Sequence, residues 1–156
     1  MKVHVMTSDI KEQTSKGFYA WSLLVLFTLT YTFSFVDRQV INLLVEPIKG
    51  DMGLTDVQIS YLQGLIFVIP YVLLSVPIGR LVDVFSRIYV IISGILVWSF
   101  ATIAAGLSGN YTQLAIARGF VGAGEAALTP AVWSMFPDIF TKKQLAVAMS
   151  IFSMAP

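Results

Sequence analysis

Residues 87–107 read RIYVIISGILVWSFATIAAGL and carry one charge, at Arg87. An α-helix needs about 20 predominantly apolar residues to cross the hydrocarbon core of a bilayer, so this run is long enough to span a membrane. Runs of spanning length also cover residues 18–45, 57–81 and 111–136. The sequence therefore predicts an all-α, polytopic membrane protein with four spanning helices.

The composition supports a lipid environment for most of the chain. Of its 156 residues, 56% are hydrophobic and 12% are charged, and the mean hydropathy is +0.79. Soluble domains are about 45–50% apolar and about 25% charged. The formal net charge of +1 gives no basic excess for binding nucleic acid. The composition thus predicts a partner in the lipid bilayer and none in nucleic acid.

Residue types that carry enzyme or metal chemistry are scarce. The chain has no cysteine, and its one histidine, His4, lies in a polar segment at the N-terminus. No paired carboxylates or metal-ligand spacing stand where a substrate would be activated. We therefore expect no cofactor, no metal site and no enzyme activity.

Local signals place the ends of the expected helices. Glu46 precedes Pro47, and proline disfavours helix in the residue before it, so the first helix is expected to end near residue 45, before a polar loop over 47–56. Thr55 and Gln58 have the spacing of a capping box, which predicts the start of the second helix. Small residues in the fourth run, from Ala115 to Ala127, predict close helix packing.

The charge distribution predicts how the chain is oriented. Residues 1–17 are polar, and no cleavage pattern follows them, so we expect a cytoplasmic tail and an uncleaved first helix. Lysine and arginine then fall mainly on the cytoplasmic side, with Lys49 alone outside, as the positive-inside rule requires. A fifth apolar run covers 144–156, too short to span, which predicts that the chain is incomplete.

Four charged residues lie inside, or near the ends of, the apolar runs. They are Asp37, Arg38, Arg118 and Glu125, and each would cost at least about 2.5 kcal/mol at the bilayer centre if it were unpaired. Arg118 and Glu125 are seven residues apart and share one helix face. We therefore expect them to face the interior of the protein.

A polar stripe in the first run leads to the same expectation. Thr30, Ser34 and Asp37 follow the spacing of one helix face. Two interpretations of the interior charges stay open. Static ion pairs would lock helices together. Alternatively, Asp37 and Glu125 exchange protons or bind a cationic group, with their charge forms tuned by the two arginines.

The loop over residues 79–87, GRLVDVFSR, resembles the signature loop of the major facilitator superfamily. The resemblance implies that Gly79 allows a tight helix contact, and that Asp83, with Arg87, engages the opposite half of the transporter to steady its outward-open state. An alternative for Asp83 and Arg87 is a surface pair four residues apart at a helix end.

Residues 117–127, ARGFVGAGEAA, look like the fourth-helix motif of the same superfamily. Further matches at 37–39, 44–49, 53–58 and 63–65 narrow the resemblance to the spinster-like transporters. This implies a twelve-helix fold, of which the chain would supply four helices and part of a fifth. It also implies proton coupling at Asp37, Arg38 and Glu125, with Arg118 linked to it, and lipid-like cargoes in some animal members.

Together these observations predict a proton-coupled secondary transporter that works by alternating access. The expected substrate is a small amphipathic or lipid-like organic anion, in a cavity that includes Thr30, Tyr31 and Ser34. The expected location is the inner membrane of a bacterium, and C-terminal helices beyond residue 156 are expected to be required for function. The alternatives are a small oligomeric multidrug exporter and a non-transporting helical membrane subunit.

Overall fold

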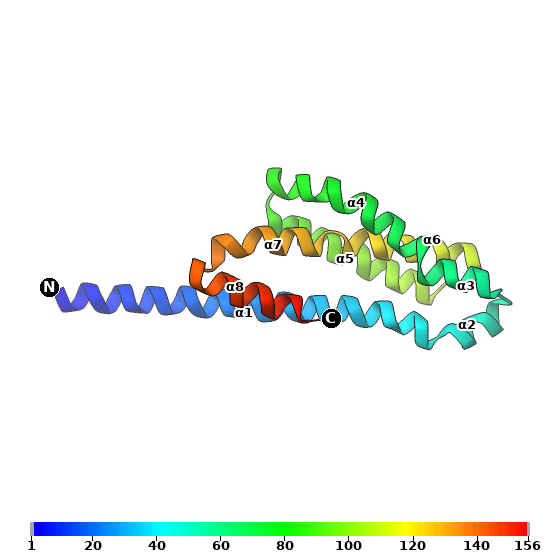
Figure 1. Ribbon diagram of the computed structural model, residues 1–156, viewed down its shortest axis with the longest axis horizontal. Helices are drawn as coiled ribbons and strands as arrows, with labels where there is room; N and C mark the ends of the chain where they lie inside the picture. The colour runs from blue at the N-terminus through cyan, green and yellow to red at the C-terminus, as the bar shows by residue number, and fades with distance from the viewer. Residues whose placement is uncertain (1, 156) are drawn as a thin grey trace. The chain divides into compact units, whose positions relative to one another are not determined.

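The computed structural model describes residues 2–155, with side chains from residue 17 onward. Every regular element in this part of the chain is an α-helix (Figure 1), which confirms the predicted all-α class. The elements are α1 (Lys2–Leu43), α2 (Val45–Met52), α3 (Asp56–Gln63), α4 (Leu65–Val84), α5 (Arg87–Gly106), α6 (Tyr111–Glu125), α7 (Leu128–Ile139) and α8 (Lys142–Ser153).

The chain divides into two compact units. One comprises Ser34–Met135, and the other combines the segments up to Phe33 and from Phe136 onward. In the second unit, aromatic rings form the contacts. Tyr31 stacks on Phe152 with ring centroids 4.9 Å apart, and Trp21 meets the edge of Phe140 at 5.4 Å.

Three segments are long and apolar enough to cross a membrane: Gly17–Leu43, Asp56–Val84 and Arg87–Gly106. The fourth expected span, over 111–136, differs because a turn at residues 126–127 divides it into α6 and α7. Pro130 explains the turn, since its ring crowds the carbonyl of Ala126 and it has no N–H to donate. The Ala127 N–H instead donates to the Gly124 carbonyl at 3.3 Å.

The expected loop over residues 47–56 is wrong for its first half, which belongs to α2. Pro47 is the third residue of this helix, where its missing N–H would have no helical partner in any case. Gly53 ends α2 with a left-handed backbone, at φ 62°. The predicted capping box is confirmed, because Thr55 and Gln58 each accept a hydrogen bond from the backbone of the other.

Helix α6 packs closely on α4 and α5 within the unit Ser34–Met135, and Figure 1 shows α5 and α6 running side by side. A Cβ atom on Gly122 would lie 2.3 Å from the Phe67 carbonyl oxygen, and one on Gly124 would lie 2.5 Å from the Trp98 nitrogen. These glycines let the backbones approach, as the small residues of this run predicted. Glu125 is the last residue of α6 and is buried.

Candidate functional site

The candidate site is a group of charged side chains within the unit Ser34–Met135, and Glu125 is at its centre. The Glu125 side chain is 1% exposed, and its Oε2 atom accepts hydrogen bonds from Arg38 Nε at 2.7 Å and Ser34 Oγ at 2.6 Å. Arg38 Nη2 lies 2.6 Å from the same oxygen. Three donor atoms from α1 therefore converge on one carboxylate oxygen of α6.

The second oxygen of this carboxylate is left without a partner. Glu125 Oε1 is buried and has no hydrogen bond within the described residues. A buried acceptor without a donor costs roughly 1–3 kcal/mol, and more when the group is charged. The Glu125 carboxylate thus has one oxygen with three close donor atoms and one oxygen with none among the described residues.

One aromatic ring holds both arginines of the group. The Arg38 guanidinium carbon lies 5.0 Å from the Phe67 ring centroid and 5.3 Å from the Tyr71 ring centroid. The Arg118 guanidinium carbon lies 4.8 Å from the Phe67 ring centroid. Arg118 is 5% exposed, and its Nε atom has no hydrogen-bond partner among the described residues. A guanidinium in this position is attracted by the ring face. Arg38 thus has an aromatic partner besides its carboxylate.

Asp37 has different surroundings from Glu125. Its Oδ2 atom accepts hydrogen bonds from Trp98 Nε1 at 3.0 Å and Thr102 Oγ1 at 3.2 Å. Asp37 also lines a cavity of about 390 Å³, together with Arg118 and Asp51. The structure thus places all four predicted interior charges in one unit, but pairs Arg38 with Glu125 and not with its neighbour Asp37.

The three predicted cavity residues, Thr30, Tyr31 and Ser34, are divided between the two compact units. Ser34 is buried and donates to Glu125 as described. Thr30 donates its hydroxyl to the Leu26 carbonyl of its own helix at 2.9 Å, and Tyr31 packs on Phe152. Thr30 and Tyr31 both belong to the second compact unit. Of this set, Ser34 is the member that belongs to the same unit as the charged group.

The three residues of the predicted signature loop lie at the ends of two helices. Gly79 has open space around the position of a Cβ atom, with no described atom within 4 Å. Asp83 is exposed in the last turn of α4, while Arg87 is half-buried and begins α5. The extended backbone at Phe85 separates the two helices. Asp83 and Arg87 thus belong to two different helices.

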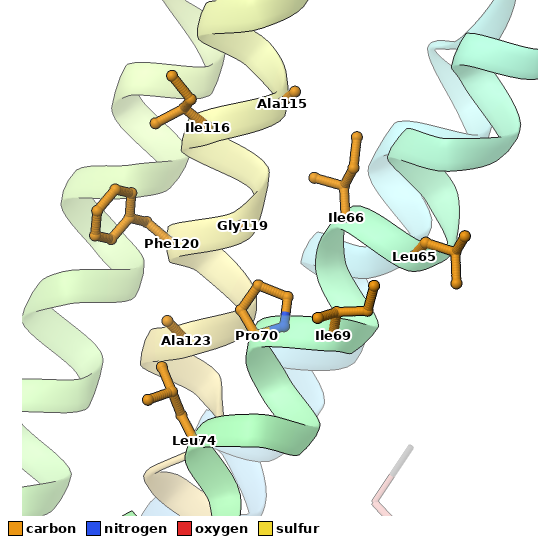
Figure 2. Close-up of a pocket in the computed structure, with 10 residues that line it drawn as sticks. All are labelled: Leu65, Ile66, Ile69, Pro70, Leu74, Ala115, Ile116, Gly119, Phe120 and Ala123. Carbon is orange, nitrogen blue, oxygen red and sulfur yellow. The ribbon is translucent and has the colours of Figure 1, made fainter.

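A second hollow contains no charge. A groove of about 590 Å³ is lined by residues of α4 and α6, and Figure 2 shows Pro70 and Leu74 of α4 next to Gly119 and Ala123 of α6. All ten of its lining residues are apolar. Binding sites orient ligands with a few well-placed polar groups, which this groove lacks. We therefore assign the candidate site to the charged group.

The sequence analysis did not identify the roles of Trp98 and Thr102. They lie one helical turn apart on α5, and both donate to Asp37. The signal available was an indole N–H within an apolar run, because a buried Trp usually finds an acceptor. Which residue accepts this hydrogen bond does not follow from the sequence alone.

The fold and the site define a class of protein. Charged residues inside membrane helices are costly and typically mark pathways for ions or substrates. The chain is an integral membrane protein whose interior holds such a group. The family model of the Major Facilitator Superfamily matches residues 27–155, and the chain belongs to this superfamily.

Relatives with known names support a more specific resemblance. The chain is 29% identical to an "MFS-type efflux pump" of Mycolicibacterium smegmatis, over 87% of this chain and 32% of the relative. It is 27% identical to human "Protein spinster homolog 1", over 86% of this chain and 26% of the relative. The chain thus spans about a quarter to a third of these relatives.

A solved structure agrees with this assignment. The chain is similar to the inward-facing, unoccupied crystal structure of a bacterial homolog of the human lysosomal transporter Spinster, with a TM-score of 0.84 and 34% identity. The match covers 88% of this chain and 29% of the other. The predicted resemblance to the spinster-like transporters is confirmed.

Proposed function

We propose that this chain forms part of a proton-coupled secondary transporter that works by alternating access, and that Glu125 and Asp37 are its coupling carboxylates. The observation that carries the proposal is the Glu125 side chain, 1% exposed, which holds Arg38 at 2.6 Å. An ion pair inside a membrane protein is costly to desolvate, so a structural role alone would be served as well by apolar packing.

Protonation of Glu125 would change the partners of Arg38. A neutral carboxylic acid attracts the guanidinium far less than a carboxylate does. Arg38 would then rely on Phe67 and Tyr71, whose rings it already faces at 5.0 and 5.3 Å. Its side chain is 32% exposed, so a released guanidinium is accessible to another anion. Proton binding at Glu125 would thereby make Arg38 available to substrate.

The chemistry of Arg38 sets the proposed substrate class. A guanidinium binds carboxylate or phosphate through paired hydrogen bonds, and the helices around it present mainly apolar side chains. An amphipathic or lipid-like organic anion fits both features, because its charged group would bind the guanidinium and its apolar part would contact the apolar side chains. Thr30 and Tyr31 remain proposed members of the substrate path, as Gly79, Asp83 and Arg87 remain proposed parts of the conformational loop.

Orientation and assembly complete the proposal. We place the chain in the inner membrane of a bacterium with residues 1–17 in the cytoplasm, because Lys49 is then the only basic residue on the outer side. Alternating access requires two halves that rock around a central site. Helices that follow this chain in a full-length transporter would form the second half.

The test is proton-linked flux in proteoliposomes that contain the full-length transporter and an internal pH dye. The probe is a fluorescent lysophosphatidylglycerol, with ethidium as a cationic comparison. We expect Glu125→Gln to lower proton-linked flux by about a hundredfold, the scale of a lost acid–base group. Glu46→Gln is the matched control, because Glu46 is exposed on α2. Full proton-linked flux in Glu125→Gln would contradict the proposal.

A further inference from the structure

Two neutral side chains of α5 hold the carboxylate of Asp37. Trp98 Nε1 and Thr102 Oγ1 donate to the same oxygen, Oδ2, at 3.0 and 3.2 Å. Within the described residues, these are the hydrogen bonds that the Asp37 side chain accepts. The nearby arginines are engaged elsewhere, Arg38 with Glu125 and Arg118 over the ring of Phe67.

We propose that Trp98 and Thr102 are positioning residues that orient the Asp37 carboxylate toward the cavity of about 390 Å³ without forming an ion pair with it. The proposal rests on the proposed function in treating Asp37 as a coupling residue. Neutral donors fix the direction of a carboxylate without supplying a counter-charge. A proton or small cation that enters the cavity would therefore meet an oriented anion.

The packing of α5 on α6 puts these donors in place. Gly94, Trp98 and Thr102 are spaced four residues apart and form one row on α5. At Gly94 the row touches α6, because a Cβ atom there would lie 2.8 Å from the Gly124 carbonyl oxygen. A Cβ on Gly124 would likewise meet the Trp98 backbone nitrogen at 2.5 Å. The close approach of Gly124 thus positions the Trp98 backbone against α6.

The cavity is suited to receive a small charged species. Asp37, Thr102 and Ser108 line it, and Asp51 lies on its wall as a second carboxylate. Arg118 lines it as well and sets a positive charge near Asp37. The other titratable group near Asp37 is Glu125 on α6. Among these charges, the hydrogen bonds from Trp98 and Thr102 set the direction of the Asp37 carboxylate.

The direct test is the indole N–H resonance of Trp98 in the ¹⁵N-labelled full-length transporter in lipid nanodiscs. The chain contains three tryptophans, and Trp98→Phe assigns the resonance. We expect Asp37→Asn to shift the Trp98 indole signal and to leave that of Trp133 in place, since Trp133 is exposed on α7. An unchanged chemical shift of the Trp98 indole N–H in Asp37→Asn would overturn the proposal.

Proton-linked flux supplies a second readout. We expect Thr102→Val to lower flux by about tenfold and Thr102→Ser, which keeps the hydroxyl, to retain it, as for a lost hydrogen bond to a charged group. Trp133→Phe is the matched control for Trp98→Phe. Equal flux in the two Thr102 variants would overturn the positioning role. Normal flux in both Asp37→Asn and Glu125→Gln would instead contradict the proposed function, while the indole shift would still report the contact.

Discussion

Asp37 and Glu125 are two carboxylates in one compact unit with opposite kinds of partner. Glu125 is 1% exposed and holds the charged Arg38, whereas Asp37 is half-buried, lines a cavity and accepts from the neutral Trp98 and Thr102. Glu125 is therefore buried in an ion pair, whereas Asp37 is oriented by hydrogen bonds and borders a cavity. Neighbouring acidic residues in one unit can thus have different electrostatic surroundings, one with a cationic partner and the other with neutral hydrogen-bond donors.

The largest expected effect comes from breaking the ion pair of Glu125. Arg38→Met leaves a buried carboxylate without its cation, which costs about 3–5 kcal/mol when one partner of a buried pair is removed. Denaturant unfolding of the full-length protein in mixed micelles would measure the loss of stability. The double variant Arg38→Met with Glu125→Gln should regain much of it. Additive losses in the double variant would show that the two side chains do not interact.

Overpacking of the α5–α6 contact should have the next largest effect. Gly124→Ala would place a methyl group 2.5 Å from the Trp98 nitrogen, and forcing an atom into such a contact costs about 1–3 kcal/mol. Gly79→Ala is the matched control, because open space surrounds that position. We expect Gly79→Ala to leave the unfolding of this unit unchanged within about 0.5 kcal/mol. Equal losses in both variants would contradict the close packing.

The aromatic support of the arginines should contribute less. Stepwise fluorination of Phe67 weakens the ring's attraction for a cation while keeping its shape, and we expect a graded loss of about 1–2 kcal/mol. Tyr71→Phe, which keeps a ring 5.3 Å from Arg38, should have little effect. The measurement is unfolding of the fluorinated series. A flat response to fluorine number would show that Phe67 acts by packing alone.

The smallest effect is expected at the surface, where Lys49 of α2 pairs with Asp56 at the start of α3. The hydrogen bond to the Asp56 carboxylate, with its charge, raises the pKa of Lys49 above its ordinary value of 10.5. A raised pKa means that the pair stabilises the fold below that value and loses this contribution as pH rises through the folded pKa. Unfolding of Lys49→Met should therefore differ slightly from wild type below pH 10.5 and match it only once the pH exceeds the raised pKa of the folded state.

Much of this arrangement was predictable from periodicity within single helices. The spacing of Arg118 and Glu125, and of Ser34 and Asp37, predicts that their side chains lie on inward faces, and the capping box at Thr55 follows from local chemistry. The helix α2 could not be predicted from the sequence in this way, because a proline among polar residues is as compatible with a loop as with the first turn of a helix.

Contacts between helices were beyond the sequence alone. That Arg38 pairs with Glu125, 87 residues away, depends on how α1 packs on α6. The two donors to Asp37 depend likewise on the register of α5 against α6, which the glycine contacts set. A neutral residue such as Phe67 gives no sequence signal that it holds two cations, because most aromatic residues in apolar helices only pack.

The central claim is that Glu125 takes up and releases a proton, and infrared difference spectroscopy tests it most directly. Full-length transporter in lipid would be compared at two pH values between which proton-linked flux changes. We predict a carboxylic acid C=O band that is absent in Glu125→Gln and unchanged in Glu46→Gln. An identical band in wild type and Glu125→Gln would show that the protonated group is another residue, and would contradict the account.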